Sequence, residues 1–202
     1  MQPSPARIER PLLIVVSAPS GAGKSTLCNR LVKERASVEY SISCTTRAPR
    51  GAEQDGEHYY FLSSKEFRQR VRRGEFLEHA KVHGNRYGTL ADTVQFAMEE
   101  GRHIILDIDV QGVHQLRSSL QTMEERSLIR RGFLDIFIEP PSLEVLENRL
   151  RKRGTDSDAV IRKRLKNAAK EMQAAEEYTH RLVNDQLDPT YERLCQIIDA
   201  SV

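Results

Sequence analysis

The sequence has few cysteines, little net charge and no long apolar run. Cys28, Cys44 and Cys195 are far apart and lack C-x-x-C spacing, which argues against a disulfide framework or zinc site and favours the cytoplasm. Lys and Arg number 31 against 29 Asp and Glu, so a net charge of +2 predicts no attraction to nucleic acid or to an anionic membrane. No apolar run approaches the ~20 residues of a transmembrane helix, and residues 1–10 lack the apolar block of a signal peptide.

The length and the hydrophobic content bound the number of domains. A chain of 202 residues with 39% hydrophobic residues can bury one sizeable core, but it is short for two independent domains. No internal repeat or low-complexity tract interrupts the pattern. One domain with insertions is therefore expected.

The most informative stretch runs from residue 12 to residue 26, where five apolar residues precede the sequence Ser-Ala-Pro-Ser-Gly-Ala-Gly-Lys-Ser-Thr. The apolar run predicts a strand buried on both faces, and Gly21 and Gly23 allow a turn that exposes successive backbone N–H groups. Such a turn before a helix binds phosphate, with Lys24 reaching the outer phosphates of a nucleoside triphosphate and Ser25 reaching its magnesium ion. The stretch predicts nucleotide binding and phosphoryl transfer.

Further elements follow from hydrophobic periodicity and from end signals. Strands are predicted at residues 40–43, 59–62, 75–82, 103–107, 133–138 and 182–183, with helices between them at about 24–36, 64–73, 90–100, 112–120, 143–153 and 161–175. Ser63 and Glu66 have the spacing of a capping box, Thr89 is a candidate cap of the next helix, and Asp188 precedes Pro189 as a candidate cap of the last helix.

This order of elements predicts an α/β fold of the phosphate-loop type, with a parallel sheet flanked by helices. The expected core comprises residues of about 10–37, 90–140 and 166–202, a β-rich insertion comprises about 38–89, and an arginine-rich lid comprises about 141–165. Asp107 ends a buried strand and Asp109 follows it, at the sheet edge where ligands of open α/β sheets bind. The charged stretch 121–132 has no functional interpretation.

Several separate motifs together resemble the guanylate kinase family over nearly the whole chain. They are residues 17–26, 41–50, 56–59, 76–80, 84–89, 106–112, 149–154 and 183–185. Family members also use alanine at the position of Ala18, where other phosphate loops have glycine. The stretch 121–132 is longer than the family's usual connection. The resemblance implies a phosphate-loop kinase fold with a GMP-binding insertion and a lid.

The resemblance also implies a role for each motif residue. ATP would contact Ala18, Pro19, Ser20, Gly21, Ala22, Gly23, Lys24, Ser25, Thr26 and, near the adenine, Asn184. Catalysis would rest on Lys24, Arg149, Arg153 and Arg164, with Ser25 and Asp107 as candidate Mg²⁺ ligands. The GMP phosphate would be bound by Arg47, Arg50, Tyr59 and Tyr87, and the guanine base by Ser43, Glu78, Thr89 and Asp109.

These roles make chemical sense. Two guanidinium groups and two phenols suit a dianionic phosphate. Carboxylates of Glu78 and Asp109 can accept hydrogen bonds from guanine N1–H and N2–H₂ while a hydroxyl donates to O6, a pattern that adenine cannot satisfy. The expected reaction is transfer of the γ-phosphoryl group of ATP to GMP, and also to dGMP, with Mg²⁺ required.

Alternatives from other classes remain open on sequence. A guanylate-kinase-like binding module would have lost catalysis, although such modules typically lose the lysine that is present here as Lys24. A small GTPase would explain the D-x-x-G at residues 109–112, but residues 184–187 do not match N-K-x-D. A kinase of another nucleoside or sugar phosphate is the third alternative. Taken singly, Glu78 also fits a solvated strand residue, and Arg151 and Lys152 fit a solvated helix end.

Overall fold

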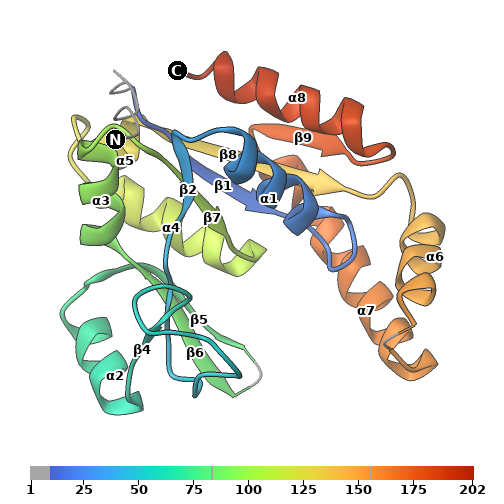
Figure 1. Ribbon diagram of the computed structural model, residues 1–202, viewed down its shortest axis with the longest axis horizontal. Coiled ribbons are helices and arrows are strands. Elements are labelled where there is room, and N and C mark those ends of the chain that lie inside the picture. The colour runs from blue at the N-terminus through green and yellow to red at the C-terminus, as the bar shows by residue number, and fades with distance from the viewer. Residues whose placement is uncertain (1–9, 83, 155) are drawn as a thin grey trace.

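The computed structural model describes residues 10–82, 84–154 and 156–202. The expectation of no signal peptide falls almost wholly on residues outside these ranges. A central sheet with helices on both faces forms the core of the molecule (Figure 1). A smaller sheet with one helix, and a separate pair of helices, α6 and α7, project from the same side of this core (Figure 1).

The central sheet has five parallel strands in the order β2-β7-β1-β8-β9. The strands are β1 (Leu13–Ser17), β2 (Val38–Tyr40), β7 (His103–Asp107), β8 (Phe133–Glu139) and β9 (His180–Val183). In the middle of the sheet, Val16 of β1 lies beside Asp107 of β7 and Ile136 of β8. The predicted parallel α/β fold is confirmed, and the carboxyl ends of β1 and β7 lie next to each other.

The apolar run before the phosphate loop is buried from both sides. Leu12, Ile14 and Val16 belong to one core cluster with residues of α1 (Lys24–Glu34) and α8 (Leu187–Asp199). Leu13 and Val15 belong to a second cluster with residues of α3 (Ala91–Glu99), α4 (Val110–Thr122), α5 (Leu128–Arg131) and the 3₁₀ helix η1 (Met172–Glu177). Helices therefore cover both faces, as the absence of polar alternation in the run predicts.

The smaller sheet has four strands in the order β4-β3-β6-β5, with only the β3–β4 pair parallel. These are β3 (Cys44–Thr45), β4 (Tyr60–Phe61), β5 (Phe76–Val82) and β6 (Asn85–Leu90), with α2 (Ser64–Arg72) between β4 and β5. Ser63 Oγ accepts a hydrogen bond from the backbone N–H of Glu66 at 3.1 Å, which confirms the predicted cap of α2.

The boundary between core and insertion differs from the sequence prediction. The single strand expected at residues 40–43 is wrong, because residues 41–43 are not in a strand. They connect β2, an edge strand of the central sheet, to β3 in the smaller sheet. Residues 38–40 therefore pair within the core sheet, and the insertion begins after Tyr40.

The predicted lid region contains α6 (Leu143–Arg153) and α7 (Asp158–Glu171), which continues into η1. Ser142 Oγ caps α6 by accepting from the N–H of Val145 at 3.1 Å, and Gly154 ends it in the left-handed region at φ 68°. The two helices hold a small apolar cluster of their own. This cluster packs the two helices against each other.

Two other predicted helix starts are wrong. Leu90, not Thr89, is the N-cap residue of α3, and no side chain caps that helix. The Thr89 hydroxyl instead donates a hydrogen bond to Glu78 on the neighbouring strand. The last helix begins at Leu187 after Gln186, so Asp188 lies within its first turn instead of capping it.

A buried histidine stabilises the beginning of β7. His103 is 5% exposed, and its Nδ1 accepts a hydrogen bond of 2.9 Å from the backbone N–H of Leu12. Burial lowers the pKa of His103, the nearby Arg35 guanidinium lowers it further, and Asp199 opposes them. Arg35 and Asp199 form an ion pair joining the end of α1 to the end of α8.

The three cysteines are free thiols, two of them buried, in agreement with the sequence analysis. Within residues 10–82, 84–154 and 156–202, no helix combines the length and apolar character required to cross a membrane.

Candidate active site

The phosphate loop joins the end of β1 to α1. Gly21 and Gly23 have φ values of 99° and 97°, a left-handed conformation that glycine adopts without strain. The N–H of Ala22 donates to the carbonyl of Pro19 at 3.0 Å and tightens the turn. The loop borders a cavity of about 350 Å³, lined by Ala18, Pro19, Ser20, Gly21, Gly23, Lys24, Ser25, Thr26, Asp107, Asp109, Val110, Arg153 and Glu171. All predicted phosphate-loop residues except the buried Ala22 reach this cavity.

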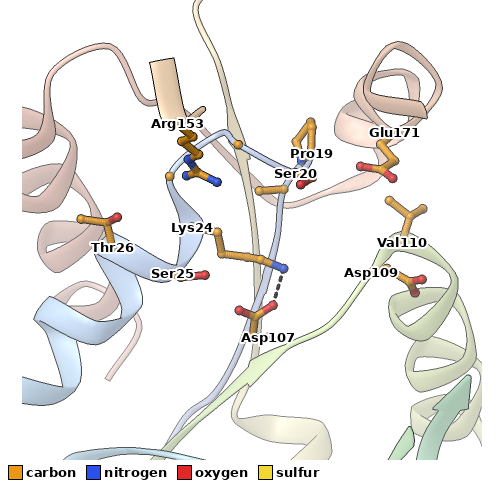
Figure 2. Close-up of a pocket in the computed structure, with 13 residues that line it drawn as sticks. Pro19, Ser20, Lys24, Ser25, Thr26, Asp107, Asp109, Val110, Arg153 and Glu171 are labelled. Carbon is orange, nitrogen blue, oxygen red and sulfur yellow. Dashed lines mark ion pairs between the residues drawn. The ribbon is translucent and has the colours of Figure 1, made fainter. Parts of the chain in front are cut away.

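Lys24 and Asp107 form an ion pair across the floor of this cavity (Figure 2). Lys24 begins α1, and Asp107 ends β7 on the neighbouring strand, so the parallel register brings the two together. Ser25 follows Lys24 and lines the same cavity. The two predicted magnesium ligands, Ser25 and Asp107, thus share one cavity with the lysine that is predicted to bind phosphate.

A second cavity of about 350 Å³ opens toward the smaller sheet. Its lining includes five of the residues predicted to bind GMP, namely Ser43, Tyr59, Glu78, Tyr87 and Asp109. Lys24, Asp107 and Asp109 line both cavities. The phosphate-loop cavity and the cavity of the inserted sheet therefore meet at Lys24 and two carboxylates, which is the arrangement needed to bring two ligands into contact.

Glu78 is the most deeply buried acid of the second cavity, with 6% of its surface exposed. Thr89 Oγ1 donates a 2.7 Å hydrogen bond to Glu78 Oε1 across the β5–β6 pair. Burial raises the pKa of Glu78, the Thr89 hydroxyl opposes that shift, and the charge of Asp109 adds to it. In this structure the Thr89 hydroxyl donates to Glu78, and Ser43 is the predicted hydroxyl residue that lines this cavity.

Asp109 has a structural task as well as a place in both cavities. Its Oδ1 accepts a 2.8 Å hydrogen bond from the N–H of Gly112 and caps α4. A Cβ atom at Gly112 would lie 3.2 Å from Glu78 Oε2, so this glycine keeps space for the carboxylate. The D-x-x-G pattern at residues 109–112 is therefore explained by helix capping and by close packing on Glu78.

A glutamate organises the two arginines predicted to bind phosphate. Arg47 forms a two-pronged ion pair with Glu53, both bonds measuring 2.9 Å, and the backbone N–H of Arg50 donates to Glu53 at 2.8 Å. These bonds lower the pKa of Glu53 to about 2, with Arg47 as the main cause. Arg47 also lies 5.3 Å from the ring centre of Tyr59, whose ring packs edge-on against Tyr87 at 6.1 Å. Glu53 thereby shapes the basic loop.

The three predicted lid arginines occupy different places. Arg153 lines the phosphate-loop cavity. Arg164 donates to Ser20 Oγ of the phosphate loop at 3.3 Å and pairs with Asp156 at 3.3 Å. Arg149 is not among the residues that line this cavity; its Nη2 donates to the backbone carbonyl of Asn184 at 2.8 Å. Of the three, Arg153 lines the phosphate-loop cavity and Arg164 is hydrogen-bonded to the loop, whereas Arg149 is bonded to the segment after β9.

Sequence reasoning missed several residues of this region. Glu53 and Asp156 each hold a predicted functional arginine, and Glu171 lines the phosphate-loop cavity from α7. Burial raises the pKa of Glu171, Asp109 adds to the shift and Lys24 opposes it. The spacing of Glu53 from Arg47 in a Pro/Gly loop was an available signal. No local pattern distinguishes Glu171 from the other acids of its helix, because its position depends on how the lid packs.

Comparisons with known proteins agree with this geometry. The model of the guanylate kinase family matches residues 10–201. The guanylate kinase of Ruegeria pomeroyi is 46% identical over 95% of this chain and 86% of its own length. That of Alkalilimnicola ehrlichii is 44% identical over 94% of this chain and 88% of its own. A crystal structure of guanylate kinase from Anaplasma phagocytophilum superposes with a TM-score of 0.69 at 32% identity, covering 96% of this chain and 87% of that one. The chain therefore belongs to the guanylate kinase family.

Proposed function

We propose that the protein transfers the γ-phosphoryl group of ATP to GMP, giving ADP and GDP, on free nucleotides in the cytoplasm. Family membership supports this reaction. The observation that carries it is the meeting of two cavities at Lys24, one bordered by the phosphate loop and the other by Glu78 and Asp109. A donor nucleotide in the first and an acceptor in the second would bring their phosphates together at this lysine.

On the donor side, catalysis would depend on positioning and electrostatics. The transition state of phosphoryl transfer is loose and spreads negative charge over the equatorial oxygens, so fixed cations at that point lower the barrier. The candidate cations are Lys24 of the phosphate loop and, from the lid, Arg153 and Arg164. Before the γ-phosphoryl group of ATP can be transferred to GMP, Lys24 must exchange its ion pair with Asp107 for contacts with the phosphates.

The release of Asp107 from Lys24 suits a role in holding Mg²⁺. Mg²⁺ prefers oxygen ligands and usually takes only one or two from the protein, the rest being water and phosphate oxygens. The Ser25 hydroxyl and the Asp107 carboxylate line one cavity and fit that requirement. When bound, Mg²⁺ would neutralise charge on the β- and γ-phosphates.

On the acceptor side, base and phosphate would be bound by different groups. Carboxylates of Glu78 and Asp109 would accept from the N1–H and N2–H₂ edge of guanine, with Ser43 donating to O6. The 5′-phosphate would be bound by two arginines and two tyrosines, namely Arg47, Arg50, Tyr59 and Tyr87. None of these contacts involves the 2′-hydroxyl, so dGMP should also be phosphorylated.

The test is a coupled ADP-release assay with purified protein, ATP and each of GMP, dGMP, AMP, CMP and UMP, with and without Mg²⁺. Robust, Mg²⁺-dependent turnover with GMP and dGMP and little with the others is expected. Turnover with AMP but not GMP would overturn the assignment of substrate. GMP binding detected by calorimetry without any ADP release would favour the non-catalytic binding module.

A further inference from the structure

Asn184, which follows β9, has its side chain packed directly on the phosphate loop. Its amide Nδ2 donates a 2.7 Å hydrogen bond to the carbonyl oxygen of Ala22, and the residue is only 6% exposed. The packing is tight enough that a Cβ atom at Gly23 would lie 2.2 Å from this nitrogen. Glycine at position 23 is thus required both by its φ of 97° and by the presence of Asn184.

This hydrogen bond determines how one peptide group of the loop faces. The peptide bond between Ala22 and Gly23 is trans, so the Ala22 carbonyl and the Gly23 N–H point in opposite directions. Asn184 holds the carbonyl on its own side, and the N–H of Gly23 consequently turns away from Asn184. Gly23 lines the phosphate-loop cavity, where a backbone N–H is a donor for a phosphate oxygen.

Asn184 is itself held from two elements. Its backbone N–H donates to the carbonyl of Glu139 at the end of β8 at 2.7 Å, which fixes it to the central sheet. Its backbone carbonyl accepts a 2.8 Å hydrogen bond from Arg149 of lid helix α6, and Arg149 also donates to the carbonyl of Asp185 at 3.2 Å. Together, the hydrogen bonds of Asn184 to Ala22, Glu139 and Arg149 link the phosphate loop to the sheet and the lid.

Helix α6 also touches the phosphate loop without this link. A Cβ atom at Gly21 would lie 2.9 Å from Leu146 and 3.0 Å from Leu150, both fully buried in α6. Helix α6 thus contacts the loop directly at Gly21, and it is connected to Ala22 through the hydrogen bonds of Asn184. A movement of α6 would be transmitted to the peptide that faces the phosphates.

We propose that Asn184 is a positioning residue for phosphoryl transfer, which orients the Ala22–Gly23 peptide toward the donor phosphates and is held in register with the lid by Arg149. The proposal rests on the proposed donor role of the phosphate loop. It gives Asn184 a task at the phosphates, in place of the contact near the adenine that the family resemblance implies. It also makes Arg149 an anchor, whereas Arg153 and Arg164 contact the reacting groups.

The decisive variant is Asn184→Asp, which preserves the shape of the side chain but replaces the donating amide with a carboxylate. A carboxylate facing the Ala22 carbonyl has no proton to donate, and the two oxygens repel each other. Asn184→Ala removes the bond without adding charge, and Arg149→Ala removes the anchor while leaving the amide. Asp185→Asn is the matched control, because it replaces a carboxylate with an amide on the adjacent, exposed side chain.

Three measurements separate positioning from a general structural role. They are the affinity for a fluorescent ADP analogue, kcat and KM for ATP and GMP separately, and the thermal melting temperature. Asn184→Asp should weaken binding of the ADP analogue and lower kcat, each by roughly 10-fold or more, while KM for GMP stays within about twofold of wild type. Asn184→Ala and Arg149→Ala should change the same quantities less, and Asp185→Asn should resemble wild type.

Wild-type affinity for the ADP analogue and wild-type kcat in folded Asn184→Asp would overturn the proposal. A parallel loss of ADP affinity, GMP affinity and melting temperature would overturn it as well, since that is the signature of a residue that only stabilises the fold. If Asn184→Asp does not fold, Asn184→Ala and Arg149→Ala decide by the same criteria. Because ADP binding needs no acceptor, a wild-type protein inactive on GMP would refute the proposed reaction while leaving this comparison valid.

Discussion

Replacing Glu78 with glutamine should separate recognition of guanine from stability of the fold. In the structure Glu78 is 6% exposed and receives a 2.7 Å hydrogen bond from Thr89 on its Oε1 atom. A glutamine carbonyl can still accept that bond, so the β5–β6 pair should keep its contact. The second oxygen, however, becomes an NH₂ donor, which would face the N1–H and N2–H₂ donors of guanine.

The magnitude follows from the kind of hydrogen bond that is lost. Hydrogen bonds to a charged partner contribute about 1.5–3 kcal/mol, which corresponds to roughly one to two orders of magnitude in GMP affinity. Stability should change in the opposite direction. Burial raises the pKa of Glu78, so keeping it ionised at neutral pH is unfavourable in the folded state, and Glu78→Gln removes that penalty. The melting temperature should therefore be unchanged or higher.

The pH dependence provides an independent check. A protonated Glu78 loses an acceptor, so the GMP affinity of the wild type should fall as pH decreases through the raised pKa of Glu78, starting at a higher pH than for an ordinary glutamate near 4.3. The phosphate of GMP titrates near pH 6 in both proteins, so the difference between wild type and Glu78→Gln isolates the carboxylate.

Calorimetric titration with GMP and with an ATP analogue between pH 4.5 and 8, together with thermal melts, tests this prediction. ATP affinity should stay within about twofold of wild type. A variant that melts at a much lower temperature, or that binds ATP and GMP equally less well, would refute the reasoning. Glu78 would then be structural, and recognition of the base would depend on Asp109 and Ser43.

Three further predictions concern other parts of the molecule. Lys24→Met should lower kcat by on the order of 10² or more while the protein stays folded, since it removes a fixed cation from the transferring group; steady-state kinetics check this, and normal turnover would exclude Lys24 from the mechanism. Glu53→Gln should raise KM for GMP by roughly 2- to 10-fold, with a smaller change in kcat, because Arg47 would no longer be held in place by its two-pronged ion pair. A larger change in kcat than in KM for GMP would contradict this. Stability should fall as pH decreases below about 6.5, because burial lowers the pKa of His103 and the unfolded chain therefore takes up the proton first; the measurement is unfolding by urea from pH 5 to 8. In His103→Asn, where the amide oxygen can still accept from Leu12, that slope should be smaller, and an unchanged slope would show that other groups are responsible.

Short-range rules accounted for much of the fold. The unbroken apolar run at residues 12–16 predicts a strand buried on both faces, and the two core clusters confirm it. Ser63 caps its helix as predicted, since a cap needs only a side-chain oxygen and an N–H two or three residues away. Thr89 shows the limit of such rules: it has the right residue type for a cap, yet its hydroxyl bonds to Glu78 on the neighbouring strand.

The sequence by itself determined the family, the phosphate loop and the parallel α/β core, because periodicity, glycine positions and motif order are properties of neighbouring residues. Only the tertiary structure decided how the functional residues meet. The ion pair of Lys24 with Asp107, the packing of Glu78 against Gly112, and the hydrogen bond from Asn184 to Ala22 join residues 34 to 162 positions apart. Such contacts depend on strand order and on helix packing, for which no local pattern is sufficient.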